Sequence, residues 1–279
     1  MKNQMYPCLW FDRKAKEAAD FYCSVFQHTK IMSENPMVVT FESAGQKFMC
    51  LNGGPHFTIN PSISFFVVCT SEEEVDSTWT RLMEHGHALM ELDKYPWSDK
   101  YGWLQDKYGV SWQLSFGKME DVGQKFTPSL MFTGKQAGKA EQAIEFYTSI
   151  FKPSSVVEIA RYTAEEPDVE GTVKHAQFHL QGNVFMVMDS SLQHSFGFNE
   201  AVSLVVPCET QEEIDYYWEK LSAVPEAEQC GWLKDRFGVS WQIVPVVLEK
   251  LMGDPSRTQR VVDAFMKMKK FDIETLLNA

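Results

Sequence analysis

One thirteen-residue stretch occurs twice in this sequence, and it constrains the fold more than any other feature. GWLQDKYGVSWQL begins at Gly102 and GWLKDRFGVSWQI begins at Gly231, and nine of the thirteen positions are identical. Two further blocks return in the same order: AADFYCSVF at Ala18 matches AIEFYTSIF at Ala143, and TSEEEVDSTWTRL matches ETQEEIDYYWEKL. The spacing between the copies far exceeds the roughly 20–50 residues of solenoid repeats. The chain is therefore predicted to contain a duplicated domain.

The repeat divides the 279 residues into four predicted parts. The first copy covers residues 1–117, and the second copy covers residues 126–245. Between them, residues 118–125 (KMEDVGQK) are short and polar, as expected of a linker. Residues 246–279 form a C-terminal tail that is predicted to be helical.

The tail carries its own helix signals. Asp254 is placed to cap a helix that has Pro255 in its first turn. An apolar stripe follows on one side of this helix, formed by Val261, Val262, Phe265, Met266 and Met268. Such a stripe needs a partner surface, which is either the chain's own domains or a second chain. The sequence leaves both alternatives open, so further homodimerisation is one of the expectations.

Each copy has a regular order of strands and helices. In the first copy, a helix with apolar residues at helical spacing follows the short apolar strand CLWF. Strands are predicted at Met37–Glu42 and Lys47–Asn52, and the pattern restarts with the strand ISFFVVC and a helix at Glu72–Glu84. The repeated stretch closes the copy as a hairpin that turns at Asp106–Gly109. Each copy thus contains two strand–helix–strand–strand–strand units, which predicts an α+β fold.

Composition and charge exclude several classes of protein. The formal net charge of −12 leaves no wide basic stripe to follow phosphates, so we expect no nucleic-acid partner. No window approaches the roughly 20 apolar residues that span a bilayer, and the N-terminus lacks an apolar segment of signal-peptide length. We therefore expect no membrane partner and a cytoplasmic location. The six cysteines form no CxxC pair and lie mostly in apolar runs, which favours buried free thiols.

Several motifs resemble those of a known superfamily. Paired βαβββ units, with FY…VF in the first helix and DKYGVSWQL in the final hairpin, are similar to the vicinal oxygen chelate (glyoxalase/bleomycin resistance/dioxygenase) superfamily. The motifs LNGGP, SISFFV, YPW and FMVMDSS resemble its PhnB-like branch, which often carries the label 3-demethylubiquinone-9 3-methyltransferase. The resemblance implies two tandem modules, each of paired βαβββ units that form a curved mixed sheet around a cup. It also implies that the modules pair within the chain.

The resemblance also identifies positions where a metal would be held. Metal-using members place a His at the start of the first strand, a His or Glu on the strand that opens the second unit, and a Glu on the last strand. Those positions carry, or lie near, Pro7, Ser62 and Gln113 in the first copy and Pro128, Ala201 and Gln242 in the second. These side chains are poor ligands for a divalent metal, so no metal and no other cofactor is expected. His175 and His179 share one face of a strand but have no third ligand, a pattern more typical of a surface or packing feature.

Strand parity and the geometry of the superfamily suggest which residues line the two cups. The expected lining is Leu9, Phe11, Phe48, Phe66 and Gln113 in the first copy and Leu130, Phe132, Phe185, Val205 and Gln242 in the second. Asp189 ends an apolar strand, and it either faces the second cup or forms part of a turn. Such cups suit a small apolar or aromatic molecule that is fixed by one or two polar contacts.

Two functional hypotheses follow. The first is a metal-free protein that binds a small molecule, in the manner of the drug-resistance members of the superfamily. The alternative is an enzyme of the superfamily, either metal-independent or with an unrecognised metal site. The methyltransferase label has no support in the sequence, because none of the sixteen glycines lies two positions from another and no GxGxG loop exists to hold a nucleotide cofactor.

Overall fold

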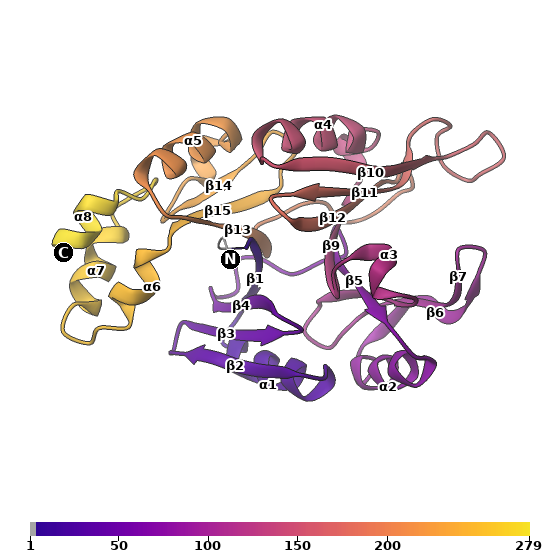
Figure 1. Cartoon of the computed structure of the whole chain (residues 1–279), viewed down its shortest axis with the longest axis horizontal. Helices are drawn as coiled ribbons and strands as arrows, with labels where there is room; N and C mark the ends of the chain where they lie inside the picture. Colours follow the sequence, from indigo (N-terminus) through magenta and orange to yellow (C-terminus); the bar gives the residue numbers. More distant parts are fainter. Residues whose placement is uncertain (1–3) are drawn as a thin grey trace. The chain divides into compact units, whose positions relative to one another are not determined.

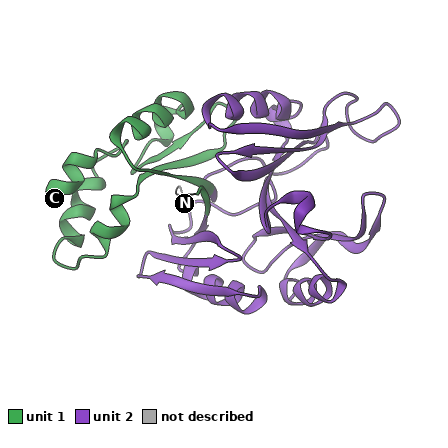
Figure 2. Cartoon of the chain, in the orientation of Figure 1, with its two compact units in different colours: residues 1–7, 203–279 green, residues 8–202 purple. Residues whose placement is uncertain are grey.

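The computed structural model describes residues 4–279, which form two compact units (Figures 1 and 2). The larger unit covers residues 8–202. The smaller unit consists of residues 203–279 together with the N-terminal segment up to Pro7. Among the helices of residues 4–279, none combines the length and the apolar character needed to cross a bilayer.

The first βαβββ unit forms a small mixed sheet with one helix. Its elements are β1 (Tyr6–Phe11), α1 (Ala15–Val25), β2 (Thr29–Glu34), β3 (Val38–Ser43) and β4 (Gln46–Asn52). Strand β1 runs parallel to β4, which pairs antiparallel with β3, and β3 pairs antiparallel with β2. Ala44 and Gly45 both have positive φ, +48° and +77°, as the tight β3–β4 turn requires. The two predicted strands of this unit are confirmed to within one residue at their ends.

The next two units share one eight-stranded sheet. The second unit of the first copy contains β5 (Ile63–Cys69), α2 (Glu72–Leu82), β6 (His87–Tyr95), β7 (Ser98–Gln105) and β8 (Ser111–Phe116). After the short helix α3 (Met119–Val122), the second copy begins with β9 (Phe126–Phe132), η1 (Gly134–Gln136), α4 (Ala140–Ile150), β10 (Ser154–Arg161), β11 (Val173–Leu180) and β12 (Asn183–Asp189). The strand order is β10-β11-β12-β9-β5-β8-β7-β6 (Figure 1).

The centre of this sheet is the junction between the two copies. Strand β5 of the first copy and β9 of the second pair antiparallel, with Ile63 opposite Leu130 and Val67 opposite Phe126. The two-module fold is as expected, and this sheet joins the second unit of the first copy to the first unit of the second copy. The opening strands of all the units have similar apolar patterns, so local sequence did not determine which of them pair.

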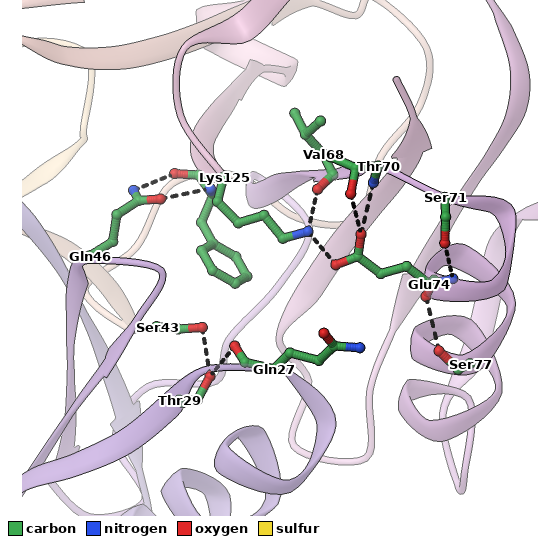
Figure 3. Close-up of polar contacts among 11 residues, drawn as sticks. Gln27, Thr29, Ser43, Gln46, Val68, Thr70, Ser71, Glu74, Ser77 and Lys125 are labelled. Atoms are coloured by element: carbon green, nitrogen blue, oxygen red, sulfur yellow. Dashed lines mark hydrogen bonds and ion pairs between the residues drawn. The ribbon is translucent and has the colours of Figure 1, made fainter. Parts of the chain in front are cut away.

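Lys125 reinforces the junction next to the first residue of β9 (Figure 3). Its ammonium group donates to the carbonyl oxygen of Val68 at the end of β5 and forms an ion pair with Glu74 Oε1 at 2.5 Å. Burial raises the pKa of Glu74, but hydrogen bonds from Lys125 and Thr70 outweigh it and hold that pKa below its usual value. The side chain of Gln46 also bonds both backbone groups of Phe126. The end of the linker and the first residue of β9 are therefore tied, between them, to both units of the first copy.

The smaller unit contains the end of the second copy and the tail. Its elements are β13 (Val202–Cys208), α5 (Gln211–Leu221), η2 (Pro225–Ala227), β14 (Trp232–Lys234), β15 (Ser240–Pro245), α6 (Val247–Met252), α7 (Thr258–Phe265) and α8 (Ile273–Asn278). Strand β13 runs parallel to β15, and β15 pairs antiparallel with the short β14.

The tail docks on its own unit. Val261 is fully buried, the Gln211 side chain bonds the carbonyl oxygen of Phe271, and Lys270 pairs with Asp215 at 2.5 Å. Intramolecular docking, one of the two alternatives, is thus observed. Helix α7 begins at Thr258, later than predicted, because Asp254 forms the preceding turn, where its Oδ1 accepts from the backbone N–H and the hydroxyl of Ser256.

The repeated stretch forms the same buried turn in both copies. Asp106 Oδ2 accepts from Trp112 Nε1 at 2.9 Å and from the Tyr22 hydroxyl at 2.8 Å, while Oδ1 accepts from the backbone N–H groups of Tyr108 and Val110. Asp235 makes the corresponding bonds to Trp241, Phe237 and Val239 in the second copy. Trp112 and Trp241 are fully buried and belong to the core. The repetition of the motif is therefore explained by packing and hydrogen bonding.

Ionisation of Asp106 is expected to make stability depend on pH. Burial raises the pKa of Asp106 from 3.8 to about 6, against the opposing effect of its four donors. The folded state binds the proton of Asp106 more tightly than the unfolded state does. Protonated Asp106 therefore stabilises the folded state most below pH ~4, and this contribution to the unfolding free energy is lost as pH rises through ~6. Between these two pH values, the contribution of Asp106 to the unfolding free energy changes by about 3 kcal/mol at most. The difference in unfolding free energy between the wild type and Asp106→Asn, measured in urea, should fall over this window, and a flat difference would contradict the assignment.

Candidate functional site

The eight-stranded sheet has one face covered by helices and one polar face. Gly102 on β7 lies against Trp79 of α2, so close that an added Cβ would lie 2.4 Å from the indole ring. At the other end, Asp189 on β12 accepts from the N–H of Ala140 at the start of α4. Because successive side chains of a strand alternate between faces, residues one step from these point to the opposite side. The polar face is defined by Ser64, Phe66, Trp103, Gln113, Thr127 and Ser129.

Strand registers bring these six residues together from four strands. Phe66 lies opposite both Gln113 of β8 and Thr127 of β9, and Gln113 lies opposite Trp103 of β7. Ser64 lies opposite Ser129 in the adjacent row. Directly paired residues stand on the same face, within reach of each other's side chains. The polar face therefore combines strands from both copies.

A chain of neutral hydrogen bonds runs across the polar face. The amide Nε2 of Gln113 donates to Ser64 Oγ at 2.7 Å, and the Tyr101 hydroxyl donates to Gln113 Oε1 at 2.8 Å. Trp103 Nε1 donates to Ser111 Oγ at 2.7 Å. Burial raises the pKa of Tyr101, so its phenol stays protonated and remains a donor at neutral pH. This arrangement orients uncharged groups and places no ionised side chain at its centre.

Thr127 is the exception in this network. Its side chain is fully buried, and its hydroxyl oxygen is the one buried side-chain nitrogen or oxygen atom of residues 4–279 that has no hydrogen-bond partner. Its register opposite Phe66 places it on the polar face. A buried hydroxyl without a partner costs on the order of 1–3 kcal/mol, so such a group marks a position that a partner from outside the chain would stabilise.

Most of the predicted lining residues lie elsewhere. Phe66 and Gln113 lie on the polar face, but Leu130, Phe132, Phe185 and Asp189 share the helix-covered face, as the registers of β9, β11 and β12 show. Leu9, Phe11 and Phe48 belong to the sheet of β1–β4 and face α1, because Phe48 stacks on Phe41, which contacts Tyr22. The prediction was wrong here because an error of one residue in strand parity moves a side chain to the opposite face.

Asp189 has a structural role. Its Oδ1 accepts from the N–H of Ala140 at 3.1 Å and its Oδ2 from that of Val173 at 3.0 Å. In the first copy, Asn52 Oδ1 accepts from the N–H of Ala15 at the start of α1 in the same way. Burial raises the pKa of Asp189. Of the two alternatives left open by the sequence, the structure supports the strand-terminal one, in which the carboxylate satisfies the first N–H groups of a helix.

The smaller unit repeats only part of the network. Gln242 Nε2 donates to Ser203 Oγ at 2.9 Å, and Val205 lies opposite Gln242. The position that matches Tyr101 is Cys230, which has a positive φ of +52° and whose thiol contacts the carbonyl oxygen of Phe265. The second copy therefore keeps the serine–glutamine pair but has no tyrosine that could extend it. Val205 and Gln242 thus share one face of their sheet, and they lie in a different unit from Leu130 and Phe132.

The residues on the polar face do not fit a divalent metal. Both ends of the Gln113 amide are already used by Ser64 and Tyr101, and Pro128 lies on the helix-covered face opposite Phe65. His175 Nδ1 lies 3.5 Å from Glu158 Oε1, and burial lowers the pKa of this histidine. No group of three His, Cys, Asp or Glu side chains within residues 4–279 is arranged to hold a metal ion.

Sequence reasoning missed Ser64, Tyr101, Trp103, Thr127 and Ser129. The alternation in SISFFV contained a signal for the first of these, because Ser62 and Ser64 fall on one face while Ile63 and Phe65 fall on the other. Thr127 and Ser129 flank Pro128 and so occupy the opposite face from it. Their convergence with Ser64 depends on the β5–β9 pairing, which the sequence did not predict.

Comparison with known proteins supports the duplicated fold. The model of the family described as 3-demethylubiquinone-9 3-methyltransferase matches residues 3–115 and again residues 124–244. A PhnB protein from Bacillus cereus is 40% identical over 42% of this chain and 100% of that chain, with a TM-score of 0.38. Glyoxalase I from Zea mays is 10% identical over 90% of this chain and 97% of that chain, with a TM-score of 0.55, which shows similarity of fold alone. No curated protein matches significantly.

Proposed function

Because the chain belongs to the PhnB-like branch of the vicinal oxygen chelate superfamily, in the family described as 3-demethylubiquinone-9 3-methyltransferase, we propose that it binds a small neutral molecule without using a metal. The proposed site is the polar face of the eight-stranded sheet. The description of the family is a label, and nothing in the polar face carries the chemistry of methyl transfer.

The chemistry of the polar face supports this proposal. Serine, threonine, glutamine and tyrosine side chains offer neutral donors and acceptors, and Phe66 and Trp103 add apolar surface beside them. Ligand sites of proteins commonly combine apolar walls with a few fixed polar groups. A charged ligand would lose hydration without gaining an ion pair, whereas a neutral ligand with one oxygen or nitrogen would match these groups.

The single observation that carries the proposal is the Thr127 hydroxyl. It is buried on the polar face and finds no partner within residues 4–279. A ligand acceptor or donor at hydrogen-bond distance would satisfy it and would be held in a fixed orientation by the neighbouring Gln113–Ser64 pair.

Replacing the Thr127 hydroxyl with a methyl group should raise the stability of the ligand-free protein while it weakens ligand binding. We expect Thr127→Val to raise the unfolding free energy of the ligand-free protein by about 1 kcal/mol, because it removes an unpartnered buried polar group. The matched control is Thr133→Val, which removes a hydroxyl bonded to the carbonyl oxygen of Phe196 at 2.9 Å and should lower stability by about 1 kcal/mol. Urea unfolding measures both. Equal losses in the two variants would show that the Thr127 hydroxyl has a partner within the protein and would remove the main support for the site.

Native mass spectrometry of freshly purified protein tests the function itself. The expected result is a bound organic molecule without a stoichiometric metal, with lower occupancy in Gln113→Leu and in Thr127→Val. About one zinc, iron or manganese per chain that is lost in Gln113→Leu would contradict the proposal and favour a metal-using enzyme. Conversion of the bound molecule during incubation would favour a metal-independent enzyme.

A further inference from the structure

The β6–β7 hairpin ends in a cluster of three aromatic side chains, Tyr95, Trp97 and Tyr101. The rings of Tyr95 and Trp97 stack with centroids 5.0 Å apart and planes 25° apart. Tyr101 meets both edge-on, at 5.6 Å from Tyr95 and 5.9 Å from Trp97. We call these three residues the aromatic tip. Trp97 is 58% exposed, which is a large apolar surface to leave in water.

The aromatic tip is connected directly to the polar face. Tyr101 belongs to both, because its ring contacts Trp97 and its hydroxyl donates to Gln113 Oε1 at 2.8 Å. The backbone of β7 places Tyr101 opposite Ser115, two residues along β8 from Gln113 and on the same face. Trp97 therefore lies at the rim of the polar face, one ring away from Gln113.

Polar contacts hold the aromatic tip in place. The Tyr95 hydroxyl donates to the carbonyl oxygen of Glu91 at 2.9 Å, and Lys94 pairs with Asp99 across the hairpin at 2.6 Å. The Ser98 hydroxyl lies 3.2 Å from that of Ser115 on β8. A ring that is already oriented loses little conformational freedom when a ligand stacks on it.

The second copy has no equivalent of the aromatic tip. Strand β14 has only the three residues Trp232–Lys234, and Cys230 stands where the first copy has Tyr101. The N–H groups of Cys230 and Gly231 bond the tail at Met268 and Lys269. Both copies keep the buried aspartate turn and the serine–glutamine pair. The two copies therefore share a scaffold and differ in the long β6–β7 hairpin, and such exposed loops are where binding residues commonly lie.

We propose that the aromatic tip makes the polar face selective for ligands that contain a planar aromatic ring, with Trp97 as the specificity-determining residue. This inference rests on the proposed binding function and adds the class of ligand. The ring of the ligand lies against the exposed indole of Trp97, and its polar group points toward the Tyr101 end of the polar face. Stacked and edge-to-face aromatic contacts add a modest stabilisation beyond area burial.

Two probes with the same carbon skeleton and one hydroxyl test the proposal on the full chain: 2-naphthol, which is planar and aromatic, and its saturated analogue decahydro-2-naphthol. Because the two also differ in donor strength, the Trp97 variants decide whether the ring contact causes the preference. Isothermal titration calorimetry should show tighter binding of 2-naphthol to the wild type. Trp97→Ala should weaken the binding of 2-naphthol by about three- to tenfold and leave the affinity for the saturated probe unchanged. The preference for the aromatic probe would then be lost. Trp97→Phe should keep most of it. Tyr216→Ala, which removes an aromatic side chain 41% exposed on α5, is the control and should change neither affinity.

The outcomes separate this inference from the function on which it rests. Equal binding of the two probes, abolished by Gln113→Leu, would overturn the aromatic selectivity and leave the polar face as a binding site. Equal weakening of both probes by Trp97→Ala would also overturn it, because it would show a structural effect. Failure of both probes to bind the wild type would overturn the proposed function and this inference together.

Discussion

Replacing Asp106 with alanine is expected to lower the unfolding free energy by about 3–5 kcal/mol. The carboxylate is 4% exposed and accepts four hydrogen bonds, two of them from Tyr22 and Trp112. Its removal leaves these donors buried without an acceptor and opens a cavity beside two large aromatic rings. A change of this size is a large part of the stability of an ordinary domain, so the variant is expected to lose much of its folded population on mild heating. Urea unfolding at pH 7 measures the effect.

The duplication supplies a matched comparison for this variant. Asp235→Ala removes the same acceptor from Trp241, Phe237 and Val239 in the second copy and should cost a similar amount. Asp20→Ala removes an exposed carboxylate paired with Lys16, and it should change stability by less than about 1 kcal/mol. If Asp106→Ala behaved like Asp20→Ala, the buried turn would not be the reason that the motif occurs twice.

Separating the two copies is expected to change the oligomeric state completely. Cutting the gene at Gly123 would yield residues 1–123 and 124–279, and it would divide the eight-stranded sheet between β5 and β9. Each fragment would then present a newly unpaired strand, and the two new edges are apolar: Phe65 and Leu130 are almost fully buried in the intact chain. Exposed apolar edges of this kind pair with other strands. We expect each fragment alone to self-associate and a mixture to form a one-to-one complex, as measured by size-exclusion chromatography with light scattering.

The control for this experiment is the intact chain cut by a protease at the exposed linker after folding. It should remain one particle, because Lys125, Gln46 and the β5–β9 ladder hold the junction without the covalent link. Stable monomeric fragments that do not associate would contradict the role given to this strand pair. The covalent link raises the effective concentration of one copy for the other to roughly the millimolar range, so it should strengthen an association that already exists.

The two copies share a scaffold but differ at the proposed site. Gln113 and Gln242 both bond a serine on the neighbouring strand, at 2.7 and 2.9 Å. Only Gln113 receives a second bond, from Tyr101, and only the first copy extends its hairpin to Trp97. The first copy thus carries the aromatic tip, whereas the corresponding segment of the second copy contacts the tail.

The candidate site was only partly predictable. Gln113 was identified because the repeated motif and the resemblance to the superfamily both pointed to it, and Phe66 followed from its place on β5. Leu130 and Phe185 were assigned to the wrong face because continuous apolar strands, such as FTPSLMF and NVFMVMD, are buried on both sides. Hydrophobic alternation cannot fix the parity of a strand that has no exposed face.

The sequence by itself determined the duplication, the four βαβββ units, the α+β class and the positions of most helices and strands. These features depend on local patterns: apolar spacing, helix caps such as Ser71, and the glycine turns of the two repeated stretches. Only the tertiary structure decided that β5 pairs with β9, and hence that Thr127 and Ser129 of one copy share a sheet face with Ser64 and Gln113 of the other. The physical reason is that several similar strand edges compete for the same partners, and the choice among them depends on the packing of the whole sheet.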